Sequence, residues 1–311
     1  MATGARLSGK RRAAGALFLL SLLWALDGLG PDLFPALRHS PMSAMERQAV
    51  TFAVLAMLAA AYARKRCASL PVRQDLVKWA AIGLLLFTVP ALITAFTQGW
   101  VSQLERVAIF SLTPVFAVVF EPHLGSGAHR GSGGLTAALA GVAGALCIFP
   151  LSIPGTPGAA AAALALVLAV ACLAIGNCIA VHLASSHSGG ALAFCAAFAC
   201  GSAAVVFAVA SAITEHAQSL LPLDVPQLVW LVIIDVPALI LLFWLLREMS
   251  AVRMTARFIL APLLTILAGI ALEQPAVTTR MVLGVALMGA GSMWLVFAPD
   301  EVSEKGTFLN S

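Results

Sequence analysis

The sequence predicts an all-α integral membrane protein with ten transmembrane helices, arranged as two inverted five-helix repeats with both chain termini in the cytoplasm. Three observations predict this: few charges, ten apolar runs of spanning length, and landmarks that recur about 150 residues apart. Of the 311 residues, 61% are hydrophobic and 10% charged, against about 25% charged in an ordinary soluble domain. A soluble fold of this size needs more polar surface. We therefore expect a multi-pass protein of the plasma membrane, in a bacterium the inner membrane.

The ten spans follow from the length of the apolar runs. The hydrocarbon core is about 30 Å thick and a helix rises about 1.5 Å per residue, so one crossing takes roughly 20 apolar residues. The predicted spans are 14–33, 47–63, 76–97, 103–121, 134–151, 158–183, 190–213, 226–247, 254–272 and 279–298. The fourth is the least regular, because Glu105 and Arg106 stand near its start.

The spans divide the chain into four parts. A cytoplasmic tail (1–13) precedes the first repeat (14–151), and a second repeat (158–298) is followed by a cytoplasmic tail (299–311). The basic stretch RLSGKRR before the first apolar run also resembles the start of a secretory signal. No small-residue cleavage site follows that run, so we interpret it as a retained first helix.

The orientation follows from the distribution of Lys and Arg between alternate loops. With the N-terminus in the cytoplasm, 14 of the 18 basic residues lie on the cytoplasmic side and 4 on the other. Arg253 and Arg257 are counted here among the cytoplasmic charges. One span too many or too few would place the later loops on the wrong side and reduce the difference in Lys and Arg between the two sides. The split therefore favours ten spans with both ends inside.

The pentapeptide VPALI occurs twice, and other landmarks repeat with nearly the same offset. Pro90 and Pro237 of the two VPALI copies are 147 residues apart, and Pro114 and Pro262, each in an F-x-L-x-P pattern, are 148 apart. Asp27 and Asn177 are 150 apart. The chain therefore consists of two similar halves that meet near residues 152–158.

Five spans in each half have a physical consequence. An odd number of crossings inserts the second copy upside down, and inverted repeats are the construction of many secondary transporters, with a substrate site between the halves. The architecture therefore favours a carrier that works by alternating access.

The residues resemble the EamA-type carriers of the drug/metabolite transporter superfamily. The resemblance covers about residues 14–298 and rests on the proline-centred helices LTPVFAVVFE and LAPLLTILAGIALEQP, on the glycine-bearing helix after each, and on the ten-helix duplicated layout. Glu273 fits the acidic residue that closes the family's proline helix, whereas Glu121 comes too early to be given that role. The family's WGSN-like motif appears only as Trp24-Ala25-Leu26-Asp27.

What the resemblance implies is the export or exchange of small metabolites, such as amino acids and related amphiphilic solutes or drugs. Two other classes stay open: an uncoupled facilitator or channel of the same fold, and a non-transporting membrane scaffold. The identity of the solute, the direction of transport and the coupling ion do not follow from the residues.

Asp235 is the most exceptional residue, because a carboxyl in hydrocarbon costs at least about 2.5 kcal/mol on insertion scales. It lies about nine residues from either end of the apolar run WLVIIDVPALILLFW, and Pro237 opens the helix beside it. One interpretation is a cavity-lining site that binds an amino group or carries a coupling proton. The other is a neutral acid tied to a neighbouring helix.

The remaining candidates for a solute or proton site are Asp27, Asn177, Trp24 and Trp244. Asp27 lies near a helix end, where water is an alternative partner. For Asn177 a tie between helices is the favoured interpretation over solute binding. The tryptophans have the interfacial belt as their alternative.

Prolines and glycines supply the expected hinges and contacts. Pro90, Pro237, Pro114 and Pro262 predict paired kinks that act as hinge or cavity elements. The expected helix-packing residues are Gly141, Gly144, Gly284, Gly289 and Gly291, since glycine allows helices to approach closely.

Other functions lack the necessary residues. The loop GSGAHRGSGG has neither the P-loop lysine nor the dinucleotide-binding spacing, and HExxH, GxSxG and CxxC are absent. We therefore expect no enzyme, no cofactor, no metal and no nucleic acid. The expected partners are a small-molecule solute and the lipid bilayer. A homodimer is compatible with the pattern, and a monomer is sufficient.

Overall fold

The computed structural model describes residues 2–34, 43–66, 70–124, 132–152, 154–214, 225–273 and 278–297. Within these ranges every regular element is a helix. Among the described residues, nine helices are long and apolar enough to cross a membrane, and Gly133–Ile148 is a shorter apolar helix. The prediction of an all-helical, multi-pass membrane protein is confirmed.

The helices of the first half match the first five predicted spans. The third span is built of three consecutive elements and the fourth of two. The helices are α1 (Ala2–Leu33), α3 (Ala44–Lys65), α4 (Arg73–Gly83), η1 (Leu84–Thr88), α5 (Val89–Phe96), α6 (Gln103–Phe110), α7 (Thr113–Leu124) and α8 (Ser132–Ile148).

The second half follows the same plan, with its third and fourth spans again composite. The helices are α9 (Pro157–Ser185), α10 (Gly189–Thr214), α11 (Val225–Trp230), η2 (Leu231–Asp235), α12 (Val236–Glu248), α13 (Ala251–Thr255), α14 (Arg257–Glu273) and α15 (Thr279–Phe297).

The two predicted tails have different outcomes. The helix α1 begins at Ala2, so the segment expected as an N-terminal tail continues the first helix, as its Ala, Leu, Lys and Arg residues favour. The segment 299–311 lies outside the described residues.

Local capping explains where several helices start. Ser43 accepts a hydrogen bond from the Glu46 N–H and caps α3, and Thr156 caps α9 through the Ala159 N–H. Ser102 and Glu105 form a reciprocal capping box at the start of α6. An N-cap of this kind satisfies backbone donors that the first turn leaves open.

The capping box explains why Glu105, a charge that makes the fourth span irregular, stands at the start of that span. The Glu105 carboxylate accepts the Ser102 N–H at 2.8 Å and also bonds the backbone N–H and hydroxyl of Ser152. Glu105 therefore joins the start of α6 to the segment between the two halves.

The third span of each half contains the same short π-helix. The segments η1 and η2 are five residues each, directly before the two VPALI copies, and start 147 residues apart (231 − 84 = 147). The Val89 N–H bonds the Leu84 carbonyl and the Val236 N–H bonds the Leu231 carbonyl, both i→i−5. Proline lacks an N–H and its ring clashes with the carbonyl four residues earlier. The wider π turn before each proline relieves this steric clash.

The other proline pair behaves differently in the two halves. In the first half, α6 ends at Phe110 and α7 begins at Thr113, next to Pro114. In the second half the break is at Ala256, and Pro262 lies inside the uninterrupted helix α14. The predicted symmetry of kinks is therefore found for Pro90 and Pro237 and not for Pro114 and Pro262.

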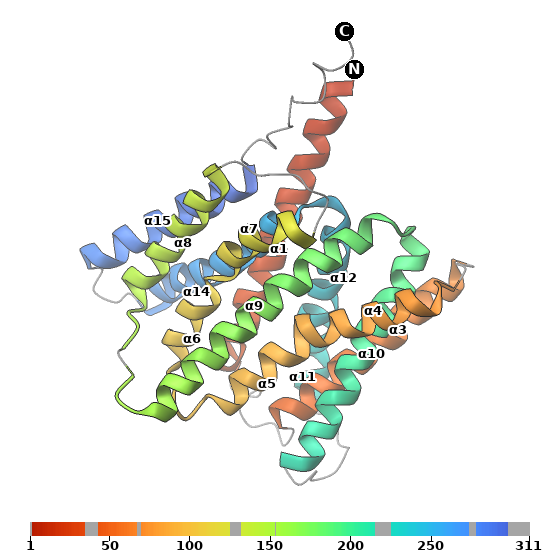
Figure 1. Ribbon diagram of the computed structural model, residues 1–311, viewed down its shortest axis with the longest axis horizontal. Coiled ribbons are helices and arrows are strands. Elements are labelled where there is room, and N and C mark those ends of the chain that lie inside the picture. Colours follow the sequence, from red (N-terminus) through yellow and green to blue (C-terminus); the bar gives the residue numbers. More distant parts are fainter. Residues whose placement is uncertain are drawn as a thin grey trace.

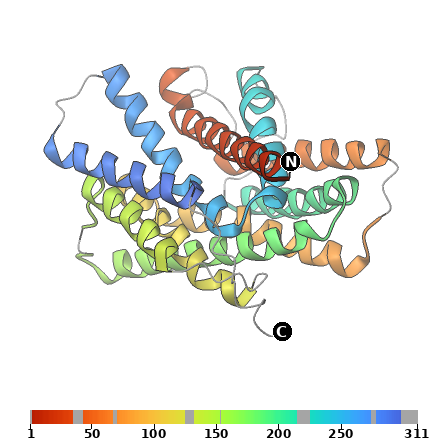
Figure 2. The same cartoon turned by 90° about the horizontal axis from the view of Figure 1, so that it is seen from above.

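Helix neighbours recur between the halves. The main contacts of α1 are with α14 and α12, and those of the corresponding helix α9 include α7 and α5. The pairs α3 with α10 and α8 with α15 each join counterpart helices of the two halves. Both ribbon views show these pairs at opposite ends of the molecule (Figures 1 and 2).

Glycines allow α8 and α15 to touch at the backbone. A Cβ on Gly144 would lie 2.6 Å from the Gly284 carbonyl oxygen, and one on Gly291 would lie 2.6 Å from the Gly141 nitrogen. A Cβ on Gly289 would meet only Leu263, at 4.0 Å. Four of the five predicted packing glycines therefore lie in the tight crossing, and Gly289 lies beside it.

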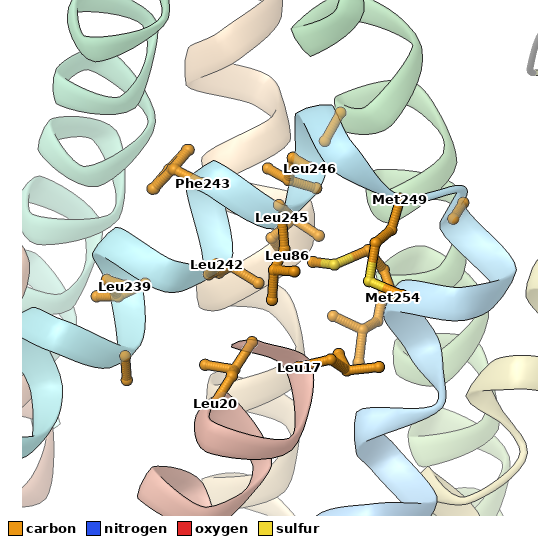
Figure 3. Packing of buried hydrophobic residues seen from close by; sticks show 14 of the residues in the cluster. Leu17, Leu20, Leu86, Leu239, Leu242, Phe243, Leu245, Leu246, Met249 and Met254 are labelled. Atoms are coloured by element: carbon orange, nitrogen blue, oxygen red, sulfur yellow. The ribbon is translucent and has the colours of Figure 1, made fainter. Parts of the chain in front are cut away.

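A large apolar core joins most of the described helices, and a smaller cluster packs Ile109 of α6 against Leu166 and Val170 of α9. Leu17 and Leu20 of α1 face Leu86 of η1 and the leucines of α12 (Figure 3). The core therefore packs the first span against the third spans of both halves.

The glycine crossing predicts a specific sensitivity to a single methyl group. Gly144→Ala is expected to destabilise the protein by about 1–3 kcal/mol, because the new Cβ meets backbone atoms of α15 that have no rotamer to escape into. Thermal unfolding in detergent measures the loss. The matched control is Gly269→Ala in α14, where a Cβ meets nothing within 4 Å. Equal melting of the two variants would contradict the close approach.

Candidate functional site

A cavity of about 560 Å³ lies between the two halves. Its walls come from α1, α3, the third span and α6 of the first half, and from α9, α10, the third span and α14 of the second. The paired helices α8 and α15 do not contribute described lining residues. Four spans of each half therefore surround one space.

Most of the wall is apolar and aromatic. Phe52 lies 4.8 Å from Phe87 and 5.7 Å from Phe207 between ring centroids, the second pair nearly parallel. These three rings come from α3, η1 and α10 and all line the cavity. A wall of this kind suits the apolar body of a small organic solute.

Asp235 is the last residue of η2 and lines the cavity, half-buried. The Thr51 hydroxyl is its hydrogen-bonding neighbour, and the charges of Asp27 and Arg47 act on it. Its helix is opened here by the π turn, as expected for a polar position that borders a cavity. The structure thus places Asp235 in the shared space rather than between packed helices.

Asp27 of α1 also lines the cavity, at an exposed position. Its Oδ1 accepts a hydrogen bond from the Trp230 Nε1–H at 3.0 Å. A Cβ on Gly30 would lie 2.7 Å from the Trp230 ring. Together these contacts hold the end of α1 against the start of the eighth span.

Arg257 is the cationic side chain among the described lining residues of the cavity. It is 1% exposed, lines the cavity, and packs against the rings of Trp24 and Phe258, with 5.1 and 4.7 Å from guanidinium carbon to centroid. Such cation–π contacts stabilise a desolvated guanidinium. Trp24, a solute-site candidate from the sequence, therefore lines the cavity and packs against this arginine.

Asn177 fixes the arginine from α9. Its Oδ1 accepts from the Arg257 Nη2–H at 2.8 Å, while its own amide donates to the Leu173 carbonyl at 2.7 Å. A second guanidinium nitrogen donates to the Met254 carbonyl at 2.7 Å. Asn177 is fully buried and reaches the site through Arg257 rather than by lining the cavity.

The structure places Arg257 and Arg253, which are counted above with the cytoplasmic charges, inside the helix bundle. Both are buried, at 1% and 8% exposure. Without them the cytoplasmic count falls from 14 to 12 (14 − 2), which still exceeds the 4 on the other side. The positive-inside rule counts residues by proximity to a span and does not distinguish a loop charge from one that enters the bundle.

A signal for Arg257 is present in the repeat itself. Arg257 immediately precedes the F-x-L-x-P pattern of the second half, where the first half has Ile109. A charge that replaces an apolar residue in one copy of a duplicated core indicates a function specific to that copy.

The other predicted site residues do not all lie in the cavity. Pro90 lines the cavity, whereas Trp244 lies apart, in an apolar groove of about 450 Å³ between α3, α10 and α12, together with Arg247. The side chain of Glu273 lies outside the described residues. Among the described residues, no group of three His, Cys, Asp or Glu side chains gathers in a way that could hold a metal ion.

Comparisons with known proteins relate the chain by fold only. No family model matches it, and no curated protein matches its sequence. A solved structure titled "Crystal structure of protein" superposes with a TM-score of 0.72 at 17% identity, covering 92% of this chain and 98% of that one. The likeness extends over nearly the whole length of both chains, so the arrangement of helices is one that another protein also adopts.

The Asn177 contact predicts a stability difference between two substitutions. Asn177→Leu is expected to destabilise the protein by about 1.5–3 kcal/mol, because a buried guanidinium loses its side-chain acceptor. Asn177→Asp, which keeps the oxygen, is the matched control and is expected to melt above the leucine variant. Thermal unfolding of the purified variants measures both, and a leucine variant as stable as wild type would contradict the role assigned to this contact.

Proposed function

We propose that this protein is a secondary carrier that moves small solutes across the membrane by alternating access. The observation that supports it most strongly is the cavity lined by four spans of each half. A binding site at the interface of two similar bundles can open to either side when the bundles rock against each other. A scaffold without a transport role has no need of such a space.

The repeated details support an inverted arrangement of the halves. The π turns recur at an offset of 147 residues, and the main helix contacts correspond when each helix is exchanged for its counterpart. With five spans in each half, we propose that the second half lies antiparallel to the first. The opened third spans of both halves are natural places for the bending that alternating access requires.

The family resemblance in the sequence adds the class of activity. On the EamA-type pattern we propose export or exchange of amino acids, related amphiphilic solutes or drugs across the bacterial inner membrane, with no enzymatic step. The mixed wall of rings and a few polar groups supports an amphiphilic solute. A monomer contains the whole site, and a homodimer is compatible with it.

Proton coupling through Asp235 is part of the proposal. The groups that face or share its surroundings are Asp27, Arg47 and Thr51, with Arg257 in the same cavity. An intramembrane carboxyl that borders a cavity is a common proton-carrying element. Transfer of a proton to or from this carboxyl would then accompany solute binding.

The inverted arrangement predicts which loops face each side. Gly155→Cys, after the fifth span, is expected to react with a membrane-impermeant thiol reagent added to intact cells. Ser188→Cys, after the sixth span, is expected to react only after permeabilisation. Both positions are exposed, so accessibility is not limited by packing, and a variant lacking the natural cysteines provides the background. Labelling of residue 155 only after permeabilisation would overturn the antiparallel arrangement.

The carrier mechanism predicts counterflow. Purified protein in liposomes loaded with unlabelled leucine or phenylalanine is expected to drive transient uptake of the labelled compound above equilibrium, because a carrier returns faster when loaded. Asp235→Asn is expected to retain counterflow and to lose accumulation driven by an imposed pH gradient. Asp75→Asn, a carboxylate outside the cavity, is the matched control.

The outcomes separate the alternatives. Flux without counterflow would indicate a facilitator or channel, and no flux of any solute in a broad metabolite set would favour a scaffold. Unchanged gradient-driven accumulation in Asp235→Asn would remove the proton role and leave the carrier intact.

A further inference from the structure

Arg257 is an unusual charge for its position. Burying a guanidinium costs several kcal/mol unless an opposite charge compensates it. Within the described part of the chain no carboxylate lies within 4 Å of it, and its hydrogen bonds go to neutral oxygens of Asn177 and Met254. Its Nε, fully shielded from solvent, has no acceptor among the described residues.

The two acids of the cavity are engaged elsewhere. Asp27 accepts from the Trp230 indole, and Asp235 has Thr51 and the charge of Arg47 as neighbours. The two acids of the cavity therefore have partners other than the Arg257 guanidinium.

The geometry around Arg257 keeps it ready to bind an anion. Asn177, Met254 and the rings of Trp24 and Phe258 fix the guanidinium from four sides. A side chain held in one orientation loses little conformational freedom when a ligand binds. Because guanidinium matches a carboxylate in shape and charge, the two form the strong charge-assisted pairs of proteins.

We propose that Arg257 is the subsite for the carboxylate of the transported solute, so that the substrates are small carboxylic acids with an apolar body. This inference rests on the proposed carrier function. Among the described lining residues Arg257 alone is cationic, which suits a single negative charge better than a phosphate dianion. The rings of Phe52, Phe87 and Phe207 provide the surface for the apolar body.

A matched series of compounds tests the subsite on the wild-type protein. The probes are 4-methylpentanoate, its amide 4-methylpentanamide, leucine and leucinamide, with 3-phenylpropionate and 3-phenylpropionamide as the aromatic pair. Each acid is expected to stabilise the detergent-purified protein against thermal unfolding at millimolar concentration, and each amide to have at least about tenfold weaker apparent affinity, as loss of a charge-assisted pair predicts. Equal effects of acid and amide, or no effect of any acid, would overturn the proposal.

Three variants assign that discrimination to Arg257. Arg257→Gln is expected to reduce the acid-to-amide ratio of affinities to about one, and Arg257→Lys to retain part of it, because the charge remains without the planar fork. Asn177→Asp places a carboxylate of the protein against the guanidinium and is expected to abolish acid binding while the fold is kept. A purely structural arginine would change the melting temperature of the free protein and leave the ratio unaltered, which would also overturn the proposal.

The readouts separate this inference from the carrier proposal. Acid binding that depends on Arg257, without counterflow in liposomes, would leave the subsite and overturn the carrier. Counterflow of solutes that lack a carboxylate, with no discrimination between acids and amides, would leave the carrier and overturn the subsite.

Discussion

In hydrocarbon each backbone N–H and C=O must find its partner inside the protein, and the rest of this structure follows from that constraint. Regular α-helices satisfy this constraint along most of the described spans. The departures from regular α-helix are the two π turns before Pro90 and Pro237 and the breaks in the fourth and ninth spans. Both π turns border the cavity, because Leu86 of η1 and Asp235 of η2 line its wall. Irregular backbone is thus concentrated where polar groups of a solute or water can replace a lost hydrogen bond.

The charged residues of the cavity differ between the two predicted halves. Asp235 stands where the first half has Thr88, and Arg257 where it has Ile109, at offsets of 147 and 148. The packing elements, by contrast, are shared by both halves, as the two π turns show. The charged groups of the cavity therefore come mainly from the second half, and the symmetric movement of the bundles would act on an asymmetric site.

The charged groups of the cavity differ in how they are stabilised. Arg257 is held by aromatic rings and neutral oxygens. Asp235 and Asp27 lie near each other with polar neighbours of their own. A cavity with charges of both signs and aromatic walls distinguishes solutes by their charge as well as by their size.

The sequence by itself determined the class of fold, an all-helical multi-pass membrane protein, because apolar length is a local property of the chain. Ten spans in two inverted halves stay a prediction from its repeated landmarks. The sequence also identified Asp235, Asp27, Trp24 and Asn177, since polar residues in apolar runs are conspicuous. It did not reveal Arg257, whose place near the end of a span is equally typical of a loop charge. Only the tertiary structure decided that α9 and α14 bring Asn177 to this arginine, that Trp24 packs on it, and that Trp244 lies in a separate groove. The reason is physical: burial and partnership depend on which helices meet, and residues 80 positions apart in the chain carry no local signal of that contact.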